Sequence, residues 1–253
     1  MLEINHLSVN LNSTRILNDI TFQARKGEIL GIIGPNGAGK STLLRAINGL
    51  LPLTHGTICL DEKSLGAISP LELSKLIASV PQVAQLPASY SVQDVVLMGR
   101  TPYLNWFGQT TLEDEEFARS AMQQTQTTEY TDRMINQLSA GEQQRVLLAR
   151  ALTQSTPVIL MDEPTAHLDL HFQIELLELI HQLVSSQQLI ALLVMHDLNL
   201  ASRYAHRILL LNHGRSEAFG LPSRVLQPGV LSKVFQLPIK VERENKAYRI
   251  FPE

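Results

Sequence analysis

Short apolar runs alternate with stretches of helical periodicity along this chain. Residues 29–33 form an apolar run that ends at Gly34, and similar runs occupy 77–80, 158–161 and 189–195. Runs of this length are typical of strands that are buried on both faces of a parallel sheet. Between the last two runs, apolar residues recur at helical spacing at Leu170, Ile174, Leu177 and Val184. The alternation predicts an α/β fold with a mostly parallel sheet.

The middle and the tail of the chain follow other patterns. Residues 41–50, directly after the glycine-rich turn, are predicted to form one helix. Residues 87–154 contain long amphipathic stretches and no strong strand candidate, which predicts a helical insertion. The tail pattern predicts a helix over 225–235 and a small hairpin made of 239–242 and 248–251. No repeat or Gly/Ser linker marks a boundary, so we expect one continuous domain.

Composition narrows the class of protein. The 253 residues carry 21 Lys and Arg against 24 Asp and Glu, a formal net charge of −3. This near-neutral charge argues against a basic groove for nucleic acid. The single cysteine, Cys59, excludes an internal disulfide and a cysteine-cluster metal site. No apolar run approaches the ~20 residues that span a bilayer, and residues 1–9 lack a signal-type pattern. We therefore expect a soluble intracellular protein that meets a membrane only through a partner.

The strongest motif is Gly-Pro-Asn-Gly-Ala-Gly-Lys-Ser at 34–41, which matches the phosphate-binding pattern G-x-x-x-x-G-K-[ST]. Glycines let backbone N–H groups wrap a triphosphate, and the N-terminus of the following helix adds its positive end. Lys40 would reach the β- and γ-phosphate oxygens, and the Ser41 hydroxyl would ligate Mg²⁺. A glycine-rich turn that binds nothing is the alternative, but the position between a buried strand and a helix favours nucleotide binding.

Two adjacent carboxylates, Asp162 and Glu163, end the apolar run 158–161. Beside a phosphate, the first carboxylate suits the Mg²⁺ shell and the second suits orienting the attacking water. Acidic residues also end strands without any chemical role. The pair alone therefore leaves both interpretations open.

Polar residues follow two further strand candidates. Gln82 comes after the run 77–80 and Pro81, and His196 comes directly after 189–195. A lone histidine at a strand end is more often structural than functional. In an open α/β sheet, however, ligands bind outside the carboxyl ends of the strands. We therefore expect one phosphate to be surrounded by Lys40, Ser41, Gln82, Asp162, Glu163 and His196.

A third motif, Leu-Ser-Ala-Gly-Glu-Gln-Gln-Arg at 138–145, opens a predicted helix. Ser139 and Glu142 have the spacing of a capping box, which is a sufficient structural explanation. The same small residues expose a helix N-terminus that can receive a phosphate. The residues alone support both interpretations.

In this order, the motifs resemble those of the ATP-binding-cassette ATPases over about residues 2–220. The matching segments are the Walker A loop at 34–41, the Q-loop at Gln82, the signature at 138–144, Walker B at 158–163, the D-loop at 166–169 and the switch histidine His196. The resemblance implies a RecA-like P-loop core at about 1–86 and 155–220, a helical subdomain at about 87–154 and a C-terminal extension at about 221–253. It also implies a head-to-tail dimer of two copies, in which ATP lies between one Walker A loop and the partner's signature.

The resemblance also assigns roles to single residues. The catalytic residues would be Glu163, His196 and Gln82, and the Mg²⁺ ligands would be Ser41, Gln82 and Asp162. The nucleotide-binding positions would be Gly34, Pro35, Asn36, Gly37, Ala38, Gly39, Lys40, Ser41, Thr42, Ser139, Ala140, Gly141, Glu142 and Asp169. Three positions depart from the family. Ala140 replaces the usual glycine, Glu142 replaces the commonest glutamine, and Leu11 stands where an aromatic residue often stacks on adenine.

Most members of this family drive a membrane transporter. Residues 91–103 and 196–201 resemble importers of metal chelates, meaning iron–siderophore, haem and cobalamin. The resemblance implies a peripheral subunit on the cytoplasmic face of the cell membrane, bound to permease subunits, served by an extracytoplasmic substrate-binding protein and without a nucleic-acid partner. The alternatives are a molybdate or metal-ion importer, a soluble ATPase of a non-transport complex such as iron–sulfur cluster assembly, and a nucleotide-binding regulatory module without turnover. The presence of both Glu163 and His196 counts against the last.

Two further features carry weaker predictions. Tyr103, Trp106 and Phe107 form an aromatic cluster, which is either core of the helical insertion or an apolar patch that faces the permease. The acidic run at 113–116 is most simply the first turn of a helix, where the helix dipole favours negative charge.

Overall fold

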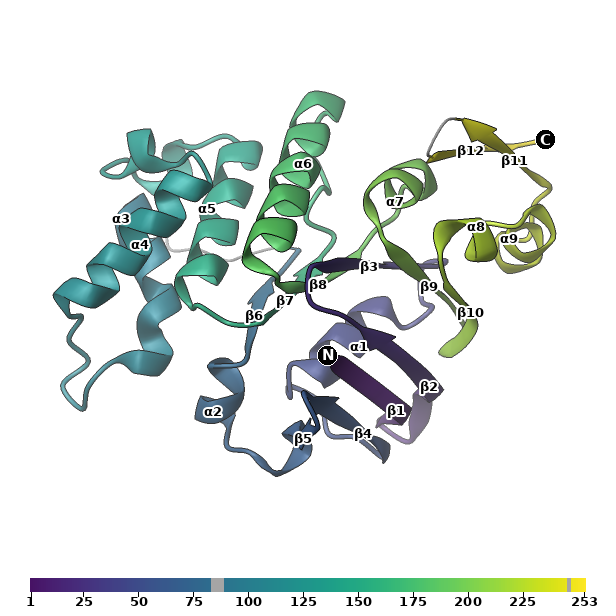
Figure 1. The fold of residues 1–253 in the computed structure, drawn as a ribbon, viewed down its shortest axis with the longest axis horizontal. Helices are drawn as coiled ribbons and strands as arrows, with labels where there is room; N and C mark the ends of the chain where they lie inside the picture. Colours follow the sequence, from purple (N-terminus) through teal and green to yellow (C-terminus); the bar gives the residue numbers. More distant parts are fainter. Residues whose placement is uncertain (83–88, 245–246) are drawn as a thin grey trace.

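The computed structural model describes residues 1–82, 89–244 and 247–253. A six-stranded sheet with the order β10-β9-β3-β8-β7-β6 forms its centre (Figure 1). The four strands predicted from the apolar runs are present, namely β3 (Glu28–Ile33), β6 (Ile77–Val80), β7 (Val158–Asp162) and β8 (Ile190–Val194). They pair in parallel, as does β9 (Arg207–Asn212) with β3, whereas β10 (Arg215–Gly220) is antiparallel. The predicted mostly parallel sheet is confirmed.

A second, antiparallel sheet has the order β2-β1-β4-β5. Its strands are β1 (Leu2–Leu11), β2 (Thr14–Ala24), β4 (His55–Leu60) and β5 (Lys63–Ser64). The hydrophobic pattern does not reveal this sheet, because β-bulges interrupt the alternation. His6 and Asp19 have positive φ angles of 53° and 59°, and the β1–β2 register shifts after Ile4.

The helix α1 (Lys40–Ile47) shares one apolar cluster with strands of both sheets. It ends earlier than the predicted 41–50, because Gly49 adopts a left-handed φ of 71° that stops the helix. Short elements, η1 (Leu65–Ala67) and α2 (Pro70–Ser74), connect the antiparallel sheet to β6.

The predicted helical insertion is present in the described part of 87–154. Its helices are α3 (Val92–Leu97), η2 (Met98–Tyr103), α4 (Leu112–Gln124), η3 (Thr128–Tyr130), η4 (Ile135–Gln137) and α5 (Ala140–Thr153). Each α-helix begins with a capping box, and together they bury a separate apolar cluster that includes Val95, Met122 and Val146. The acidic run lies in the first turn of α4, as predicted. One member, Asp114, is also buried against Arg100 at 2.7 Å.

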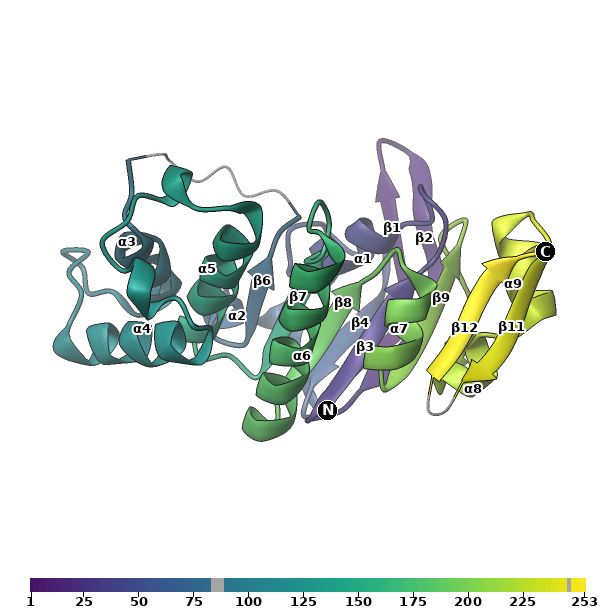
Figure 2. The same cartoon turned by 90° about the horizontal axis from the view of Figure 1, so that it is seen from above.

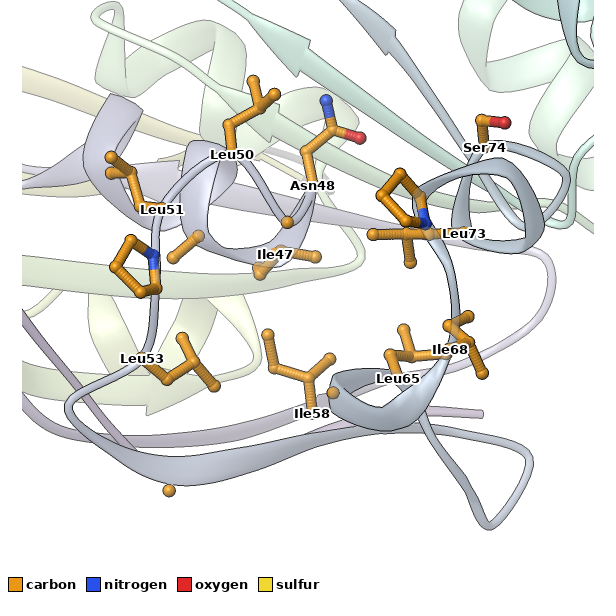
Figure 3. Close-up of a pocket in the computed structure, with 16 residues that line it drawn as sticks. Ile47, Asn48, Leu50, Leu51, Leu53, Ile58, Leu65, Ile68, Leu73 and Ser74 are labelled. Atoms are coloured by element: carbon orange, nitrogen blue, oxygen red, sulfur yellow. The ribbon is translucent and has the colours of Figure 1, made fainter.

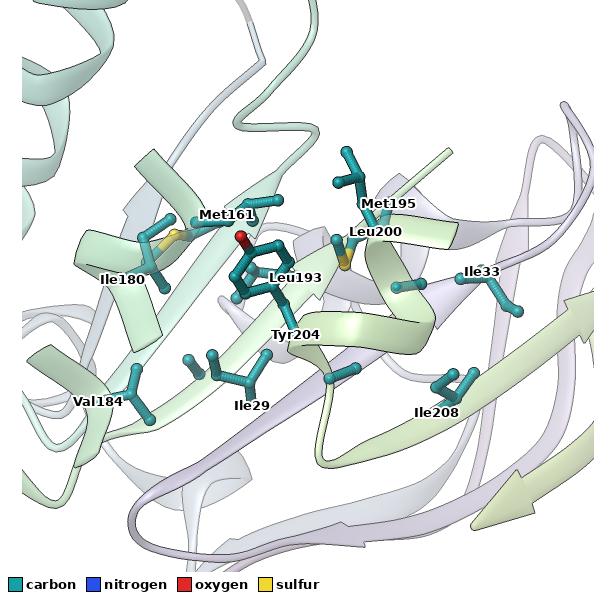
Figure 4. Packing of buried hydrophobic residues seen from close by; sticks show 14 of the residues in the cluster. Ile29, Ile33, Met161, Ile180, Val184, Leu193, Met195, Leu200, Tyr204 and Ile208 are labelled. Atoms are coloured by element: carbon teal, nitrogen blue, oxygen red, sulfur yellow. The ribbon is translucent and has the colours of Figure 1, made fainter. Parts of the chain in front are cut away.

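Two helices, α6 (Leu170–Gln187) and α7 (Leu198–Tyr204), pack on the central sheet. Figure 4 shows Ile180 and Tyr204 pointing toward Leu193 and Ile29 of the strands below. Among the described residues, no helix has both the length and the apolar content to cross a bilayer.

The C-terminal extension contains α8 (Pro222–Val225), α9 (Pro228–Phe235) and a hairpin of β11 (Ile239–Glu244) and β12 (Ala247–Pro252). The hairpin was predicted correctly. The single helix predicted over 225–235 is wrong, because Pro228 forces the preceding Gln227 into an extended conformation with φ −95° and ψ 136°. The hairpin lies beside α7 (Figure 2).

Candidate functional site

The glycine-rich loop at 34–39 joins β3 to α1 and is held tightly by its neighbours. Gly34 has a φ of +148°, and a Cβ there would lie 2.1 Å from the carbonyl oxygen of Leu211. Gly39 has a φ of +99°, and a Cβ there would lie 2.7 Å from the side chain of Leu17. Only glycine fits both places. Since Gly39 caps α1 with no side chain, the first N–H groups of this helix remain for an anion.

Lys40 folds back over this loop. Its Nζ donates to the carbonyl oxygens of Gly34 at 2.8 Å and Pro35 at 3.0 Å, and the residue is 6% exposed. Burial lowers the pKa of the Lys40 ammonium, while the negative charges of Glu163 and Asp162 oppose that shift. A desolvated cation beside free N–H groups is suited to bind phosphate oxygens.

The remaining loop positions differ in exposure. Asn36 and Gly37 are exposed at the tip of the loop, whereas Ala38 is buried beneath it. Thr42 lies in the first turn of α1 and is half-buried. The tip is therefore accessible to a ligand while its base is anchored.

Two side-chain oxygens that the sequence assigns to Mg²⁺ lie side by side next to the loop. The Ser41 hydroxyl donates to Oδ1 of Asp162 at 3.0 Å. Burial raises the pKa of the Asp162 carboxyl, against the opposing effects of the Ser41 hydrogen bond and of the charges on Arg45 and Lys40. Among the described residues, no group of three or more His, Cys, Asp or Glu could hold a metal by itself. A hydroxyl and one carboxylate nevertheless fit Mg²⁺, which completes its shell with water and phosphate oxygens.

Three strand ends converge on Glu163. Gln82, after β6, donates from Nε2 to Oε2 of Glu163 at 2.5 Å. His196, after β8, donates from Nε2 to Oε1 of the same carboxylate. Glu163 follows β7, which lies between those two strands in the sheet, and its φ of 51° is left-handed. The sheet order thus accounts for the predicted meeting of these side chains. We call the group formed by Lys40, Ser41, Gln82, Asp162, Glu163 and His196 the strand-end site.

A cavity of about 380 Å³ opens at the strand-end site and is lined by Ser41, Gln82 and Asp162. The amide of Gln82 bonds Glu163 here, so this geometry does not bring it onto the Ser41–Asp162 oxygen pair. Arg45 also lines the cavity, although the sequence analysis does not single it out. Its position four residues after Ser41, one helical turn along α1, is the signal that could have indicated it.

A larger cavity of about 610 Å³ lies elsewhere, between the end of α1, β4 and α2 (Figure 3). Leucine and isoleucine side chains such as Leu53, Ile58 and Leu65 surround it, with only Asn48 and Ser74 as polar side chains. None of its lining residues is charged, so it lacks the groups that bind a triphosphate. The smaller cavity is the better candidate for chemistry.

The signature segment forms a local cap at the start of α5. Ser139 donates from its hydroxyl and its backbone N–H to Oε2 of Glu142, both at 2.7 Å, and accepts from the Glu142 N–H at 3.3 Å. These bonds lower the pKa of the Glu142 carboxyl, which in turn raises the pKa of Tyr130 to about 12. Ala140 is exposed. The buried Gly141 packs against Phe172, where a Cβ would approach the ring to 3.2 Å.

Within the described residues, no hydrogen bond or ion pair links Ser139–Glu142 to the Lys40 loop. The remaining predicted position, Asp169, caps α6 by accepting from the N–H of Phe172 at 3.1 Å. The fold of one chain therefore assembles the strand-end site but leaves the signature positions outside it.

Leu11 lies at the end of β1 and is 36% exposed. The hairpin that carries it continues into β2, whose Ile16 and Leu17 contact the glycine-rich loop at Gly39. Leu11 is thus exposed on a hairpin whose second strand contacts the loop.

The aromatic cluster divides into two environments. Trp106 and Phe107 are 96% and 81% exposed. Tyr103 is half-buried, since its ring lies 3.9 Å from the Arg100 guanidinium and its hydroxyl donates to the carbonyl of Gln154 at 3.1 Å. The core interpretation suits Tyr103, and the surface interpretation suits the other two.

Comparison with protein families adds a decisive observation. The model of the family described as ABC transporter matches residues 17–166, which include the glycine-rich loop, the signature and both carboxylates. The chain belongs to the ABC transporter family. The ATP-binding-cassette resemblance inferred from the motifs is thereby confirmed.

Among ABC proteins, the chain is 42% identical over 240 residues to the cobalamin import ATP-binding protein BtuD of Halobacterium salinarum. That match covers 95% of this chain and 60% of the relative, so the chain spans less than two thirds of that protein.

Two solved ABC structures resemble the fold. An inward-facing metal-chelate type ABC transporter, described as putative, has a TM-score of 0.87 and 30% identity, over 100% of this chain and 97% of that one. The dimeric structure of a bacterial ABC transporter cassette has a TM-score of 0.76 and 27% identity, over 88% and 99%. The RecA-like P-loop fold predicted from the motifs is confirmed by these neighbours.

Proposed function

We propose that this chain binds and hydrolyses ATP as the ATPase subunit of an ABC importer for a metal chelate. The observation that carries the proposal is the meeting of the Lys40 loop, the Ser41–Asp162 pair and Glu163 at one edge of the sheet. Phosphoryl transfer to water needs cationic and N–H contacts to phosphates, oxygen ligands for a metal, and a base. The strand-end site contains a candidate for each.

In the proposed reaction, the triphosphate lies in the loop at 34–41, and Lys40 exchanges its two carbonyl partners for β- and γ-phosphate oxygens. Ser41 and Asp162 would hold Mg²⁺, with Gln82 nearby as a further oxygen ligand. The ion would neutralise charge on the phosphates. Thr42, beside Ser41 on α1, contributes to the same phosphate cradle.

Glu163 is proposed as the general base that accepts the proton of the attacking water at a carboxylate oxygen. Gln82 and His196 hold the two oxygens of this carboxylate in the structure, so they orient it toward the water. The half-exposed ring of His196 would also contact the γ-phosphate. Glu163→Gln is therefore expected to stop turnover without preventing ATP binding.

The signature supports a second copy of this chain as partner. Ser139 and Ala140 are exposed at the capped N-terminus of α5, which continues into Gly141 and Glu142. Asp169 lies at the start of α6. A head-to-tail dimer would bring the signature positions of one chain to the triphosphate in the loop of the other. The dimeric ABC cassette of similar fold is consistent with this arrangement.

The cargo and location are inferred from similarity. The BtuD relative is named for cobalamin import, and one neighbouring structure is a metal-chelate type transporter. We infer a subunit that binds permease subunits at the cytoplasmic face of the membrane, with an extracytoplasmic substrate-binding protein delivering an iron–siderophore, haem or cobalamin chelate.

We infer that the chain divides into a RecA-like core at about 1–86 and 155–220, a helical subdomain at about 87–154 and an extension at about 221–253. Residues 83–88 and 245–246 lie outside the described structure.

The exposed pair Trp106 and Phe107 is the proposed permease contact on the helical subdomain. An Asn105 side chain accepts the N–H of Phe107 at 3.0 Å and of Gln109 at 3.1 Å, which fixes a tight turn that presents both rings. Fixed, exposed aromatic side chains are typical of interaction surfaces.

The test is phosphate release from the purified chain with Mg²⁺ and ATP, compared with Lys40→Ala. We expect wild-type turnover and its loss in the variant. Equal rates for the two proteins would contradict the proposal. Co-purification with a multi-helix membrane protein supports the importer, and association with soluble partners alone would favour a non-transport ATPase.

A further inference from the structure

The helix α7 begins immediately after the strand-end site. β8 ends at Val194, and the link to α7 consists of residues 195–197, with His196 in its middle. The N–H of Met195 donates to the carbonyl of Ile32 at 3.0 Å, which fixes the sheet end of the link. The other end of the link leads into α7, so its position depends on how firmly α7 is held. A displacement of α7 therefore moves the His196 backbone relative to Glu163.

Tertiary contacts must hold α7 in place, because a helix of 7 residues is not stable alone. Its inner side packs Leu200 and Tyr204 onto the central sheet (Figure 4). Its first turn is capped by Asp197, which accepts from the N–H groups of Asn199 at 2.7 Å and Leu200 at 3.0 Å.

Two polar side chains of α7 bind the backbone of β12. The N–H of Ile250 donates to Oδ1 of Asn199 at 2.7 Å, and Nδ2 of Asn199 donates to the Ile250 carbonyl at 3.3 Å. The N–H of Tyr248 donates to the Ser202 hydroxyl at 2.5 Å. We call these three bonds the hairpin clasp.

The spacing of the clasp residues follows from the helical repeat of α7 and the two-residue repeat of the strand β12. Asn199 and Ser202 are three residues apart on a helix, so they lie on one face about 5–6 Å apart. Tyr248 and Ile250 are two residues apart on a strand, about 6.8 Å, and their N–H groups point to the same edge. One edge of β12 pairs with β11, and the clasp binds its other edge. Figure 2 shows β12 beside α7, in agreement with this arrangement.

Apolar packing also joins the two elements at this junction, because Ile239 and Ile250 of the hairpin are buried in the same cluster as Leu200 and Tyr204 of α7. A cavity of about 320 Å³ opens beside this contact and is lined by Leu198 and Asn199 of α7 and by Phe235, Ile239 and Phe251 of the extension. The clasp adds hydrogen bonds to this packing, and these bonds fix the position of β12 along α7.

We propose that the C-terminal hairpin is a positioning element for hydrolysis, and that Asn199 and Ser202 are positioning residues that hold α7 and so place His196 against Glu163. The proposal rests on the proposed ATPase function. It assigns to the C-terminal extension a role that none of the motifs supplies.

The experiment compares Asn199→Ala, Ser202→Ala and Asn199→Asp in the full chain. Each alanine variant should lower kcat by roughly three- to tenfold, the kinetic effect of losing about one or two hydrogen bonds, with the KM for ATP unchanged. KM should hold because neither residue touches the Lys40 loop. Asn199→Asp keeps the acceptor for the Ile250 N–H, so its kcat should be intermediate.

Amide hydrogen exchange supplies an independent readout of the clasp. Exchange at Ile250 should accelerate in Asn199→Ala, and exchange at Tyr248 should accelerate in Ser202→Ala. The matched control is Arg203→Ala on the same helix, since Arg203 is exposed and pairs with Glu178 of α6 at 3.6 Å. The control should keep wild-type kcat and wild-type exchange at both amides.

Each contrary result overturns the proposal. Faster amide exchange with unchanged kcat would show that the hairpin does not position His196. Unchanged amide exchange in the alanine variants would show that the clasp does not protect these amides. A rise in KM equal to the fall in kcat, or an Asn199→Asp variant no better than alanine, would also contradict positioning. Absence of ATP hydrolysis in the wild-type chain is a different result, which overturns the proposed function itself.

Discussion

The strand-end site and the signature turn of α5 differ in where their contacts come from. In the strand-end site, Ser41 bonds Asp162 and Gln82 bonds Glu163, so residues 121 and 81 positions apart are joined. In the signature, Ser139 bonds Glu142, three residues away. The first site is a product of tertiary folding, whereas the second is a finished helix cap that faces outward. The difference supports the proposal that one chain assembles half of a shared catalytic site and displays the other half to a second copy.

The largest expected effect concerns Glu163, the proposed base in the strand-end site. Glu163→Gln should lower ATP turnover by about 10²–10⁴-fold, because the amide cannot accept the proton of water. ATP affinity should remain close to wild type, and an ATP-bound dimer should accumulate. Phosphate release and nucleotide titration measure the two quantities, with Glu116→Gln on the exposed face of α4 as control. Near-normal hydrolysis would remove Glu163 from this role.

In the aromatic cluster of the helical insertion, the exposed Trp106 and the half-buried Tyr103 are expected to respond differently to substitution. Trp106→Glu should reduce transport by the assembled importer about tenfold or more while ATPase of the isolated chain and its free energy of unfolding stay near wild type. Tyr103→Ala should instead lower the free energy of unfolding by about 1–3 kcal/mol, since it loses a partly buried hydrogen bond and the contact with Arg100.

Urea unfolding and a reconstituted transport assay separate these two effects. If Trp106→Glu unfolds or loses ATPase activity, its proposed role as a surface contact is wrong. If transport is unchanged in that variant, the exposed pair does not contact the permease.

A smaller effect is expected at Leu11. Base stacking on an aromatic ring is worth about 1–3 kcal/mol, and Leu11, at the proposed adenine position, would supply apolar contact without a ring to stack. Leu11→Tyr should therefore tighten ATP by at most about tenfold, and the wild type should discriminate only modestly between ATP and GTP. Titration of both nucleotides into both proteins measures this. A wild-type preference of a hundredfold or more for ATP would mean that another residue recognises the base.

The smallest expected effect tests whether the signature cap is only local. The Ser139 bonds lower the pKa of Glu142, so their contribution to stability is present above the pKa of the unfolded carboxyl and is lost as pH falls through the lower folded pKa. Glu142→Gln keeps the capping geometry but does not titrate. It should change the free energy of unfolding at pH 7 by less than about 1 kcal/mol and weaken its dependence on acidic pH. Unfolding curves at pH 7 and pH 3 compare the two proteins, and identical pH dependence would contradict the assignment.

The strand-end site could be predicted because buried parallel strands are readable as apolar runs, and polar residues at their ends must meet at one edge. The antiparallel sheet could not, since the bulges at His6 and Asp19 break the alternation that marks a strand. The hairpin clasp could not be predicted either, because it leaves no pattern in the sequence. Asn199 binds the backbone of a residue 51 positions away, and any residue at that place offers the same N–H and carbonyl.

The proposal that two chains share one ATP site, with the Lys40 loop from one and the signature from the other, is tested most directly by mixing two defective chains. Lys40→Ala removes the phosphate cation, and Ser139→Arg blocks the signature with a bulky side chain. Each variant alone should release almost no phosphate from ATP, whereas their mixture should regain activity, because one site per mixed pair combines an intact Lys40 loop with an intact signature. A Ser139→Arg chain that hydrolyses ATP alone at the wild-type rate, or a mixture as inactive as its components, would contradict the shared site.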